Sequence, residues 1–98
     1  MTIEEKLNYL RNQKANPTAG GYRQLLIATY DYLREILNKT GFDWCNPYNI
    51  DVCKAVYGNT YHVPLIQRYI RDLKQLGYIS IDGKGESRKI RIIKAIDF

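Results

Sequence analysis

Apolar side chains recur at helical spacing in four stretches of the chain, and glycine or proline residues separate these stretches. The first stretch begins with a threonine and a glutamate in capping-box spacing, so it predicts a short helix over residues 3–12. The second has the broadest apolar stripe and predicts the longest helix, over residues 22–40, with Gly41 as its C-terminal cap. Residues 13–21 contain a proline and a glycine pair, so they are expected to connect the two helices.

This pattern predicts two units, an N-terminal helix with its connector over residues 1–21 and a domain over residues 22–98. The N-terminal helix either closes the core of its own domain or pairs with a second copy. Its sequence favours neither alternative, so a homodimer is one of the two expected arrangements.

A third helix is expected after a brief extended segment over residues 42–45. Asn46 should cap this helix, and Pro47 should occupy its first position, where the missing N–H of proline is tolerated. The helix should end near Tyr57, because a glycine and an asparagine follow. Its buried side is predicted to consist of residues three apart, namely Ile50, Cys53 and Val56.

The fourth helix, over residues 63–76, cannot begin much before His62, because Pro64 is tolerated only in the first helical turn. Gly77 should end it. The side chains expected in the core are Ile66, Tyr69, Ile70, Leu73 and Leu76. The side chains expected to point elsewhere are Leu65, Arg68, Arg71, Asp72 and Gln75.

The chain then alternates between apolar and polar residues, which predicts an antiparallel hairpin over residues 78–96. Its strands are expected at 78–82 and 88–96, with a glycine-rich turn between them. The side chains expected to face the core are Ile79, Ile81, Ile90 and Ile92. Those expected to face away are Lys89 and Arg91.

Length and hydropathy fit a single compact domain. The chain has 98 residues, of which 45% are hydrophobic, and a mean hydropathy of −0.43. No apolar run approaches the roughly 18 residues that a membrane span requires. The first residues include two glutamates, and no long apolar run follows them. The expectation is therefore an intracellular, cytoplasmic protein without a membrane partner.

The formal net charge of +5 is concentrated near the C-terminus. Residues 62–96 carry eight Lys and Arg against three Asp and Glu, whereas residues 1–61 carry seven against six. An excess of positive charge favours an acidic partner such as nucleic acid. The fourth helix and the hairpin are therefore expected to form the surface that contacts a polyanion.

The order helix, short strand, helix, tight turn, helix, glycine and basic hairpin resembles the winged helix-turn-helix family of DNA-binding domains, over about residues 22–96. The residues that carry the resemblance are Arg68, Ile70, Leu73 and the run Leu76-Gly77-Tyr78-Ile79. They resemble the family's arginine, its spaced leucines, and its glycine followed by an apolar residue and isoleucine at the start of the wing. The chain departs from the family at the cap of the fourth helix, where His62 replaces the usual serine or threonine, and in the segment before Tyr22, which has no counterpart.

The resemblance implies a small transcriptional regulator that binds duplex DNA as a homodimer, with the helix over 63–76 in the major groove and the hairpin over 78–96 as the wing. Because Arg reads guanine edges and Gln suits adenine, the candidate base readers are Gln67, Arg68 and Arg71. The candidate phosphate contacts are Lys74, Lys84, Arg88, Lys89 and Arg91. Tyr61 and His62, at the start of the helix, complete the expected nucleic-acid-binding set.

Two other functions stay open. Exposed aromatic residues beside cations suit base stacking on single-stranded DNA, for example in replication or in the transfer of a mobile element. The tyrosines near the turn and the start of the hairpin are Tyr48, Tyr57, Tyr61 and Tyr78. Winged helices also serve as modules that dock other proteins. Tyr30, Tyr69 and Trp44 are instead expected in the core.

No catalytic or cofactor motif stands out in the sequence. It has no glycine-rich phosphate loop, no paired catalytic carboxylates and no nucleophile motif, and its single histidine is His62. Cys45 and Cys53 match no usual zinc framework and are expected to be reduced core residues. The expectation is therefore a protein that is not an enzyme and that uses neither a cofactor nor a metal.

Overall fold

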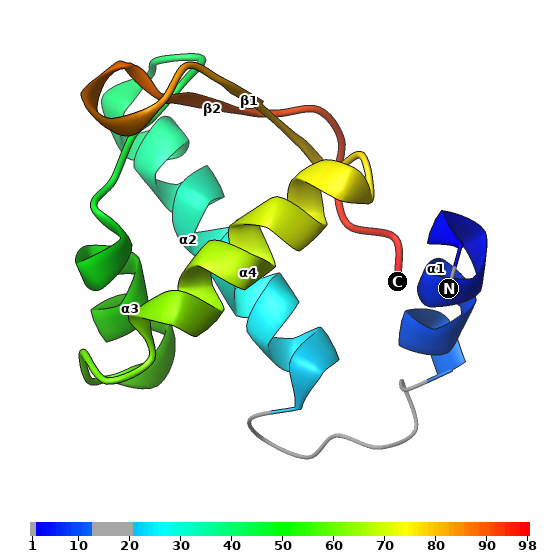
Figure 1. Ribbon diagram of the computed structural model, residues 1–98. Coiled ribbons are helices and arrows are strands. Elements are labelled where there is room, and N and C mark those ends of the chain that lie inside the picture. Colours follow the sequence, from blue (N-terminus) through cyan, green and yellow to red (C-terminus); the bar gives the residue numbers. More distant parts are fainter. Residues whose placement is uncertain (1, 13–20) are drawn as a thin grey trace.

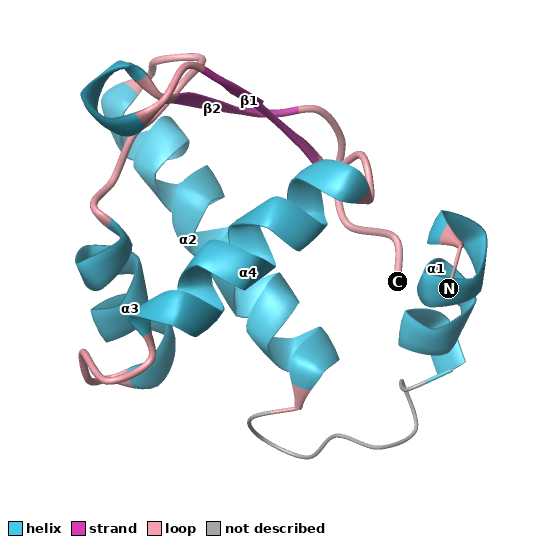
Figure 2. Ribbon diagram, in the orientation of Figure 1, coloured by secondary structure: helices cyan, strands magenta, loops and turns pink. Residues whose placement is uncertain are grey.

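The computed structural model describes residues 2–12 and 21–98, and the predicted connector lies almost entirely outside this part of the chain. Within the described residues, the fold is mainly helical, with four α-helices and one small antiparallel hairpin, as predicted (Figure 2). The elements are α1 (Ile3–Asn12), α2 (Tyr22–Thr40), α3 (Asn49–Tyr57), α4 (Val63–Gln75), β1 (Ile79–Asp82), the short 3-10 helix η2 (Gly85–Ser87) and β2 (Lys89–Ile92). Figure 1 shows α2 and α4 crossing in the middle of the molecule, the hairpin above them, and α1 beside the C-terminus.

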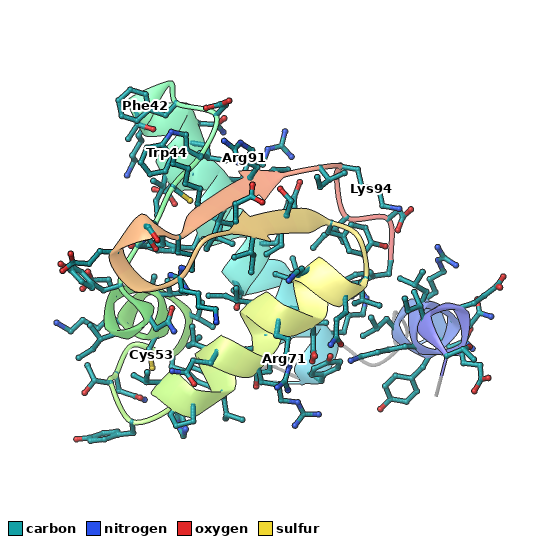
Figure 3. The ribbon with its side chains drawn as sticks, turned by 45° about the horizontal axis from the view of Figure 1, so that its top comes forward. Phe42, Trp44, Cys53, Arg71, Arg91 and Lys94 are labelled. Carbon is teal, nitrogen blue, oxygen red and sulfur yellow. The ribbon has the colours of Figure 1, made fainter. Side chains whose placement is uncertain are left out.

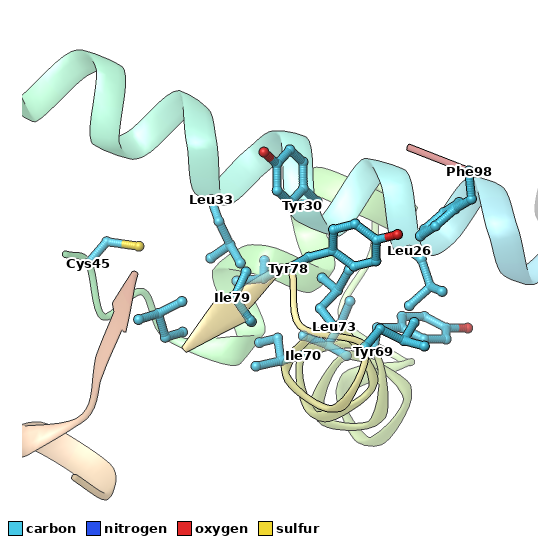
Figure 4. Packing of buried hydrophobic residues seen from close by; sticks show 14 of the residues in the cluster. Leu26, Tyr30, Leu33, Cys45, Tyr69, Ile70, Leu73, Tyr78, Ile79 and Phe98 are labelled. Carbon is cyan, nitrogen blue, oxygen red and sulfur yellow. The ribbon is translucent and has the colours of Figure 1, made fainter. Parts of the chain in front are cut away.

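The core lies between α2, α4 and the inner face of the hairpin (Figure 4). It forms because apolar residues three and four apart give each helix one apolar side. Side chains with no exposed surface include Leu26 and Leu33 of α2, Ile66 and Leu73 of α4, and Ile90 of β2. Tyr30 and Tyr69 are also buried, as predicted, and their hydroxyls bond the main-chain oxygen of Lys94 and the hydroxyl of Tyr57.

α3 begins two residues later than the sequence predicts. The residue that caps it is Tyr48, so the assignment of Asn46 as the cap and of Pro47 as the first helical residue is wrong. The Asn46 side chain is used elsewhere, because its amide donates to the main-chain oxygens of Gly85 and Glu86 at 2.9 and 3.3 Å. A contact with a segment about forty residues away therefore takes the place of the expected local cap.

The buried side of α3 also differs from the prediction. Val52 and Cys53 have no exposed surface and Val56 is half-buried, whereas Ile50 is exposed. Residues 52, 53 and 56 lie on one side of a helix, because they are one, three and four positions apart. The predicted residue Ile50 lies outside this side.

A five-residue turn, residues 58–62, joins α3 to α4. Gly58 ends α3 with a φ of 76°, a left-handed conformation that glycine adopts without a clash of its own Cβ. The main-chain oxygen of His62 accepts the N–H groups of Leu65 and Ile66 at 3.0 and 3.2 Å. Pro64 lies in the first turn of α4, as predicted.

The hairpin is shorter than predicted, because β2 ends at Ile92. Its register pairs Ile79 with Ile92 and Ile81 with Ile90. Cys45 pairs with β2 through a single antiparallel bridge, since its N–H and C=O each bond the main chain of Ile90 at 2.9 Å. Of the predicted extended segment over residues 42–45, Cys45 alone pairs with β2.

α1 packs against the same core through Leu10, which has no exposed surface, and through the half-buried Leu7. Near its end, Nη2 of Arg11 lies 3.8 Å from Oδ1 of Asp97. α1 therefore contributes to the core of its own chain. Among residues 2–12 and 21–98, no helix combines the length and the apolar character needed to cross a membrane.

Candidate nucleic-acid interface

The solvent-facing side of α4 carries positive charge and no negative charge. Among the residues of α4, all of which the structure describes, the exposed ones are Pro64, Gln67, Arg68, Arg71, Lys74 and Gln75. Three and four residues separate the members of this set, so they form one row along the helix. We call this row the α4 face.

The α4 face lacks an acid because the single acid of the helix, Asp72, is only 4% exposed. The expectation that Asp72 points away from the core is therefore wrong. Tyr22 of α2 donates its hydroxyl to Oδ2 of Asp72, and Nζ of Lys6 in α1 lies 3.4 Å from the same oxygen. Burial and the hydrogen bond to Asp72 together raise the pKa of Tyr22 well above its usual range. Asp72 thus joins α4 to both α1 and α2.

Arg68 lies at the edge of this cluster. Its Nε is 3.8 Å from Oδ2 of Asp72, and its guanidinium carbon lies 5.7 Å from the centre of the Tyr22 ring. The first contact is within α4 and the second is with α2, and the side chain remains more than half exposed. Arg68 is therefore partly engaged within the protein.

Gln67, Arg71 and Lys74 differ from Arg68, because none of them makes a side-chain hydrogen bond or an ion pair with another described residue. Figure 3 shows Arg71 extending from α4 on the side away from the hairpin. An unpaired guanidinium offers five donors and an unpaired ammonium three. These side chains form the part of the α4 face that is free to bind an external acceptor.

Tyr61 and His62, at the start of α4, have different surroundings. Tyr61 is 84% exposed. The ring of His62 packs against the ring of Tyr57, with 4.4 Å between the ring centres. Tyr61 is therefore accessible next to the α4 face, whereas His62, at the start of α4, packs against the end of α3.

Arg88 is half-buried, and its guanidinium is bonded within the protein. Its Nε donates to Oδ1 of Asn46 at 2.8 Å, and its Nη2 donates to the main-chain oxygen of Pro47 at 2.8 Å. Nη1 and Nη2 each lie 3.3 Å from Oδ1 of Asn49. Burial lowers the pKa of Arg88, although an arginine remains protonated in proteins. This side chain holds the tip of the hairpin against the start of α3.

The remaining predicted phosphate contacts lie on the hairpin and are exposed to different degrees. Lys84 is exposed in the turn between the strands. Nζ of Lys89 lies 5.0 Å from the centre of the Trp44 ring, and Nη1 of Arg91 lies 2.8 Å from Oδ2 of Asp82. In Figure 3, Arg91 and Trp44 lie on the far side of the hairpin from Arg71. The structure therefore brings the α4 residues together but does not bring Lys89 and Arg91 onto the same face.

One aromatic residue differs from the sequence expectations. Trp44 is not in the core: it is partly exposed and its ring stacks with that of Phe42. Tyr78, grouped with the tyrosines near the turn, has no exposed surface and donates its hydroxyl to the carboxylate of Asp97. Of that group, Tyr48 and Tyr61 are exposed and Tyr57 is half-buried. Alternation around Cys45 was the signal that could have placed Trp44 outward, had its pairing with β2 been foreseen.

The described residues contain no cluster of three or more His, Cys, Asp or Glu side chains that could hold a metal ion. Cys45 and Cys53 are both buried free thiols. Burial raises the pKa of the Cys45 thiol, so the thiolate, which is the reactive form, is disfavoured.

No protein-family model, no curated protein and no solved structure matches this chain. Function must therefore be inferred from the geometry of α4 and of the hairpin.

Proposed function

We propose that the protein is a winged helix that binds duplex DNA, with α4 in the major groove and the hairpin as the wing. The observation that carries this proposal is the α4 face, a row of exposed residues that includes three cations and no acid. DNA carries about one negative charge per 1.7 Å of its axis, so such a row is attracted to it. The helix has 13 residues, which span about 20 Å, and the major groove admits an α-helix.

The arrangement of the other elements supports the winged-helix assignment. A short turn separates α3 from α4, and the hairpin follows α4 without a linker. The segment before α3 bridges to β2 through Cys45 and Ile90, which adds a third, very short strand to the hairpin. This matches the order of elements on which the resemblance to the winged helix-turn-helix family rests.

The contacts within the protein suggest separate roles for the cations. Gln67 and Arg71 have no partner among the described side chains, so we assign base-edge contacts to them first. Lys74 on α4 and Lys84 in the hairpin turn are assigned to phosphates. Arg68 is a weaker base reader in this proposal, because it would have to leave Asp72. A role in transcriptional regulation, exerted by a homodimer, follows from the family resemblance alone.

The proposal is tested by measuring the affinity of the protein for labelled duplex DNA by fluorescence anisotropy across a salt series. Replacing Arg71 and Lys74 together by alanine should weaken binding about 30-fold or more, since one base contact and one phosphate contact are lost. The salt slope should also fall by about 1 for the lost phosphate contact.

The matched control removes two exposed cations from α2 instead, in the variant with Arg34→Ala and Lys39→Ala. This control should retain the affinity of the parent protein to within a few-fold, since it leaves the α4 face intact. Equal losses in both variants would show that only total charge matters and would contradict a specific role for the α4 face. An absence of duplex binding at low salt would reject the proposed function.

A further inference from the structure

A second group of aromatic and positively charged side chains lies on the outer side of the hairpin. Cys45 and Ile90 pair across the bridge, and both side chains are buried against the core. Because successive residues of an extended chain face opposite sides, the neighbours of these two residues face away from the core. We call Trp44, Phe42, whose ring stacks on that of Trp44, Lys89 and Arg91 the outer hairpin face; the acid Asp82 lies on the same side, opposite Lys89.

The aromatic residues of the outer hairpin face form a pair. The ring centres of Phe42 and Trp44 lie 6.5 Å apart and their planes differ by 13°, so the rings are nearly parallel. Phe42 is 65% exposed, and Trp44 is partly exposed. The pair adds little to the core, and it presents flat aromatic surface to solvent.

Positive charge lies directly beside these rings. Nζ of Lys89 is 5.0 Å from the centre of the Trp44 ring, and Lys89 has no carboxylate partner among the described residues. Arg91 contacts Asp82, but the Asp82 side chain is 72% exposed and such surface ion pairs contribute little. A phosphate can therefore take the place of Asp82 at Arg91 and can also bind Lys89.

We propose that the outer hairpin face binds single-stranded DNA, with an unpaired base stacked on the Phe42 and Trp44 pair and its neighbouring phosphates on Lys89 and Arg91. Every base has an aromatic face, so stacking accepts any sequence. In a duplex these faces are covered by the neighbouring base pairs, which makes an unpaired strand the fitting ligand. The site is separate from the α4 face, from which the hairpin divides it (Figure 3).

The chemistry of this face favours a nucleic acid over a second protein chain or a lipid surface. The centres of protein interfaces are depleted of lysine, whereas here Nζ of Lys89 lies 5.0 Å from the centre of the Trp44 ring. An amphipathic membrane-binding surface has a continuous apolar side, and the four side chains of this face include only two apolar ones. The combination of rings and cations is typical of proteins that bind single strands.

The experiment uses the fluorescence of Trp44, the only tryptophan of the chain. Titration of the intact protein with a thymidine 12-mer should quench this emission in a saturable way, and the affinity should fall as salt is raised. Replacing the exposed Phe42 by alanine should weaken binding about 5- to 150-fold, the range for the loss of one stacking partner. Lys89→Ala should reduce the salt slope by about 0.7.

Tyr61→Ala provides the matched control, because it removes an even more exposed aromatic ring outside the outer hairpin face. It should leave binding of the 12-mer unchanged. If Tyr61→Ala weakens binding and Phe42→Ala does not, the single strand binds beside α4 and the proposal is wrong. The variant with both Arg71→Ala and Lys74→Ala should still bind the 12-mer, so loss of duplex binding and loss of single-strand binding are distinguishable.

Three other results would also overturn the proposal. One is the absence of quenching at low salt. Another is much tighter binding of a uridine 12-mer, which would assign the face to RNA. The third is a Trp44 emission change that accompanies self-association in light scattering, or one produced by phosphatidylserine vesicles and not by the 12-mer.

Discussion

The α4 face and the hairpin both carry clustered cations, but their cations differ in what already binds them. On the α4 face, Arg71 and Lys74 have no partner among the described side chains. On the hairpin, Arg88 bonds three neighbouring residues, Arg91 contacts Asp82 and Lys89 lies over an aromatic ring. A local excess of charge in a sequence therefore does not show which cations are available to a ligand.

The difference has a geometric cause. On α4, the one acid is turned inward to Tyr22 and Lys6, so the exposed row keeps cations only. On the hairpin, the register places Asp82 opposite Lys89 and next to Arg91, so an acid lies among the cations. Side chains of a helix point in different directions around its axis, so an acid can face the core while bases on the same helix face solvent. On one side of a hairpin, neighbouring positions are close to one another, so an acid there lies next to the bases.

The largest effect, on the free energy of unfolding, should come from removing the Arg88 side chain. Arg88→Ala should lower the free energy of unfolding by about 2–3 kcal/mol, because it leaves Asn46, Asn49 and the Pro47 oxygen without their charged donor. Urea unfolding followed by circular dichroism measures the change. Lys84→Ala, a matched removal of one exposed hairpin cation, should change the free energy of unfolding by no more than about 0.5 kcal/mol. Equal losses of unfolding free energy in both variants would show that Arg88 contributes no more to stability than Lys84 does.

The two arginines of α4 should differ in how much they contribute to the affinity for duplex DNA, and this effect is smaller. Arg71→Ala should weaken duplex binding about tenfold, the scale of one arginine base contact. Arg68→Ala should weaken it about threefold or less, because Arg68 contacts Asp72 and the Tyr22 ring in the free protein. Anisotropy titrations of both variants at one salt concentration measure the ratio. A greater loss for Arg68→Ala would mean that Arg68 leaves the Asp72 cluster when DNA binds.

The smallest effect, on stability and on affinity for single-stranded DNA, should come from removing the ion-pair partner of Arg91. Asp82→Asn removes an exposed ion-pair partner, so the free energy of unfolding should change by no more than about 0.5 kcal/mol. Affinity for the thymidine 12-mer should rise about two- to threefold, because a phosphate no longer competes with the carboxylate. Urea unfolding and Trp44 quenching measure the two quantities. Weaker binding by this variant would show that Asp82 positions Arg91 rather than occupying it.

Local signals in the sequence were enough to predict most of the secondary structure. The bounds of α1 and α2 agree with the prediction, because a capping threonine starts α1 and Gly41 ends α2 with its N–H bonded to Leu37. The buried stripe of α4 agrees as well, because it follows from helical spacing alone. These features depend on residues within one or two helical turns of each other.

Three of the wrong expectations involve contacts between residues far apart in the chain. Asn46 does not cap α3, because its amide bonds the hairpin turn near Gly85. Asp72 is buried because Tyr22, fifty residues earlier, donates to it. Trp44 is partly exposed because Cys45 pairs with β2. No local pattern around any of these residues shows its partner.

The sequence by itself determined that this protein is mainly helical with a C-terminal hairpin, and that its positive charge is concentrated in residues 62–96. Only the tertiary structure decided which of those charges remain free and which aromatic rings face solvent. The physical reason is that helical periodicity is set by neighbours along the chain, whereas the partner of a polar side chain is set by packing. The inward turn of Asp72 leaves Arg71 and Lys74 free, and the bridge at Cys45 turns Trp44 outward.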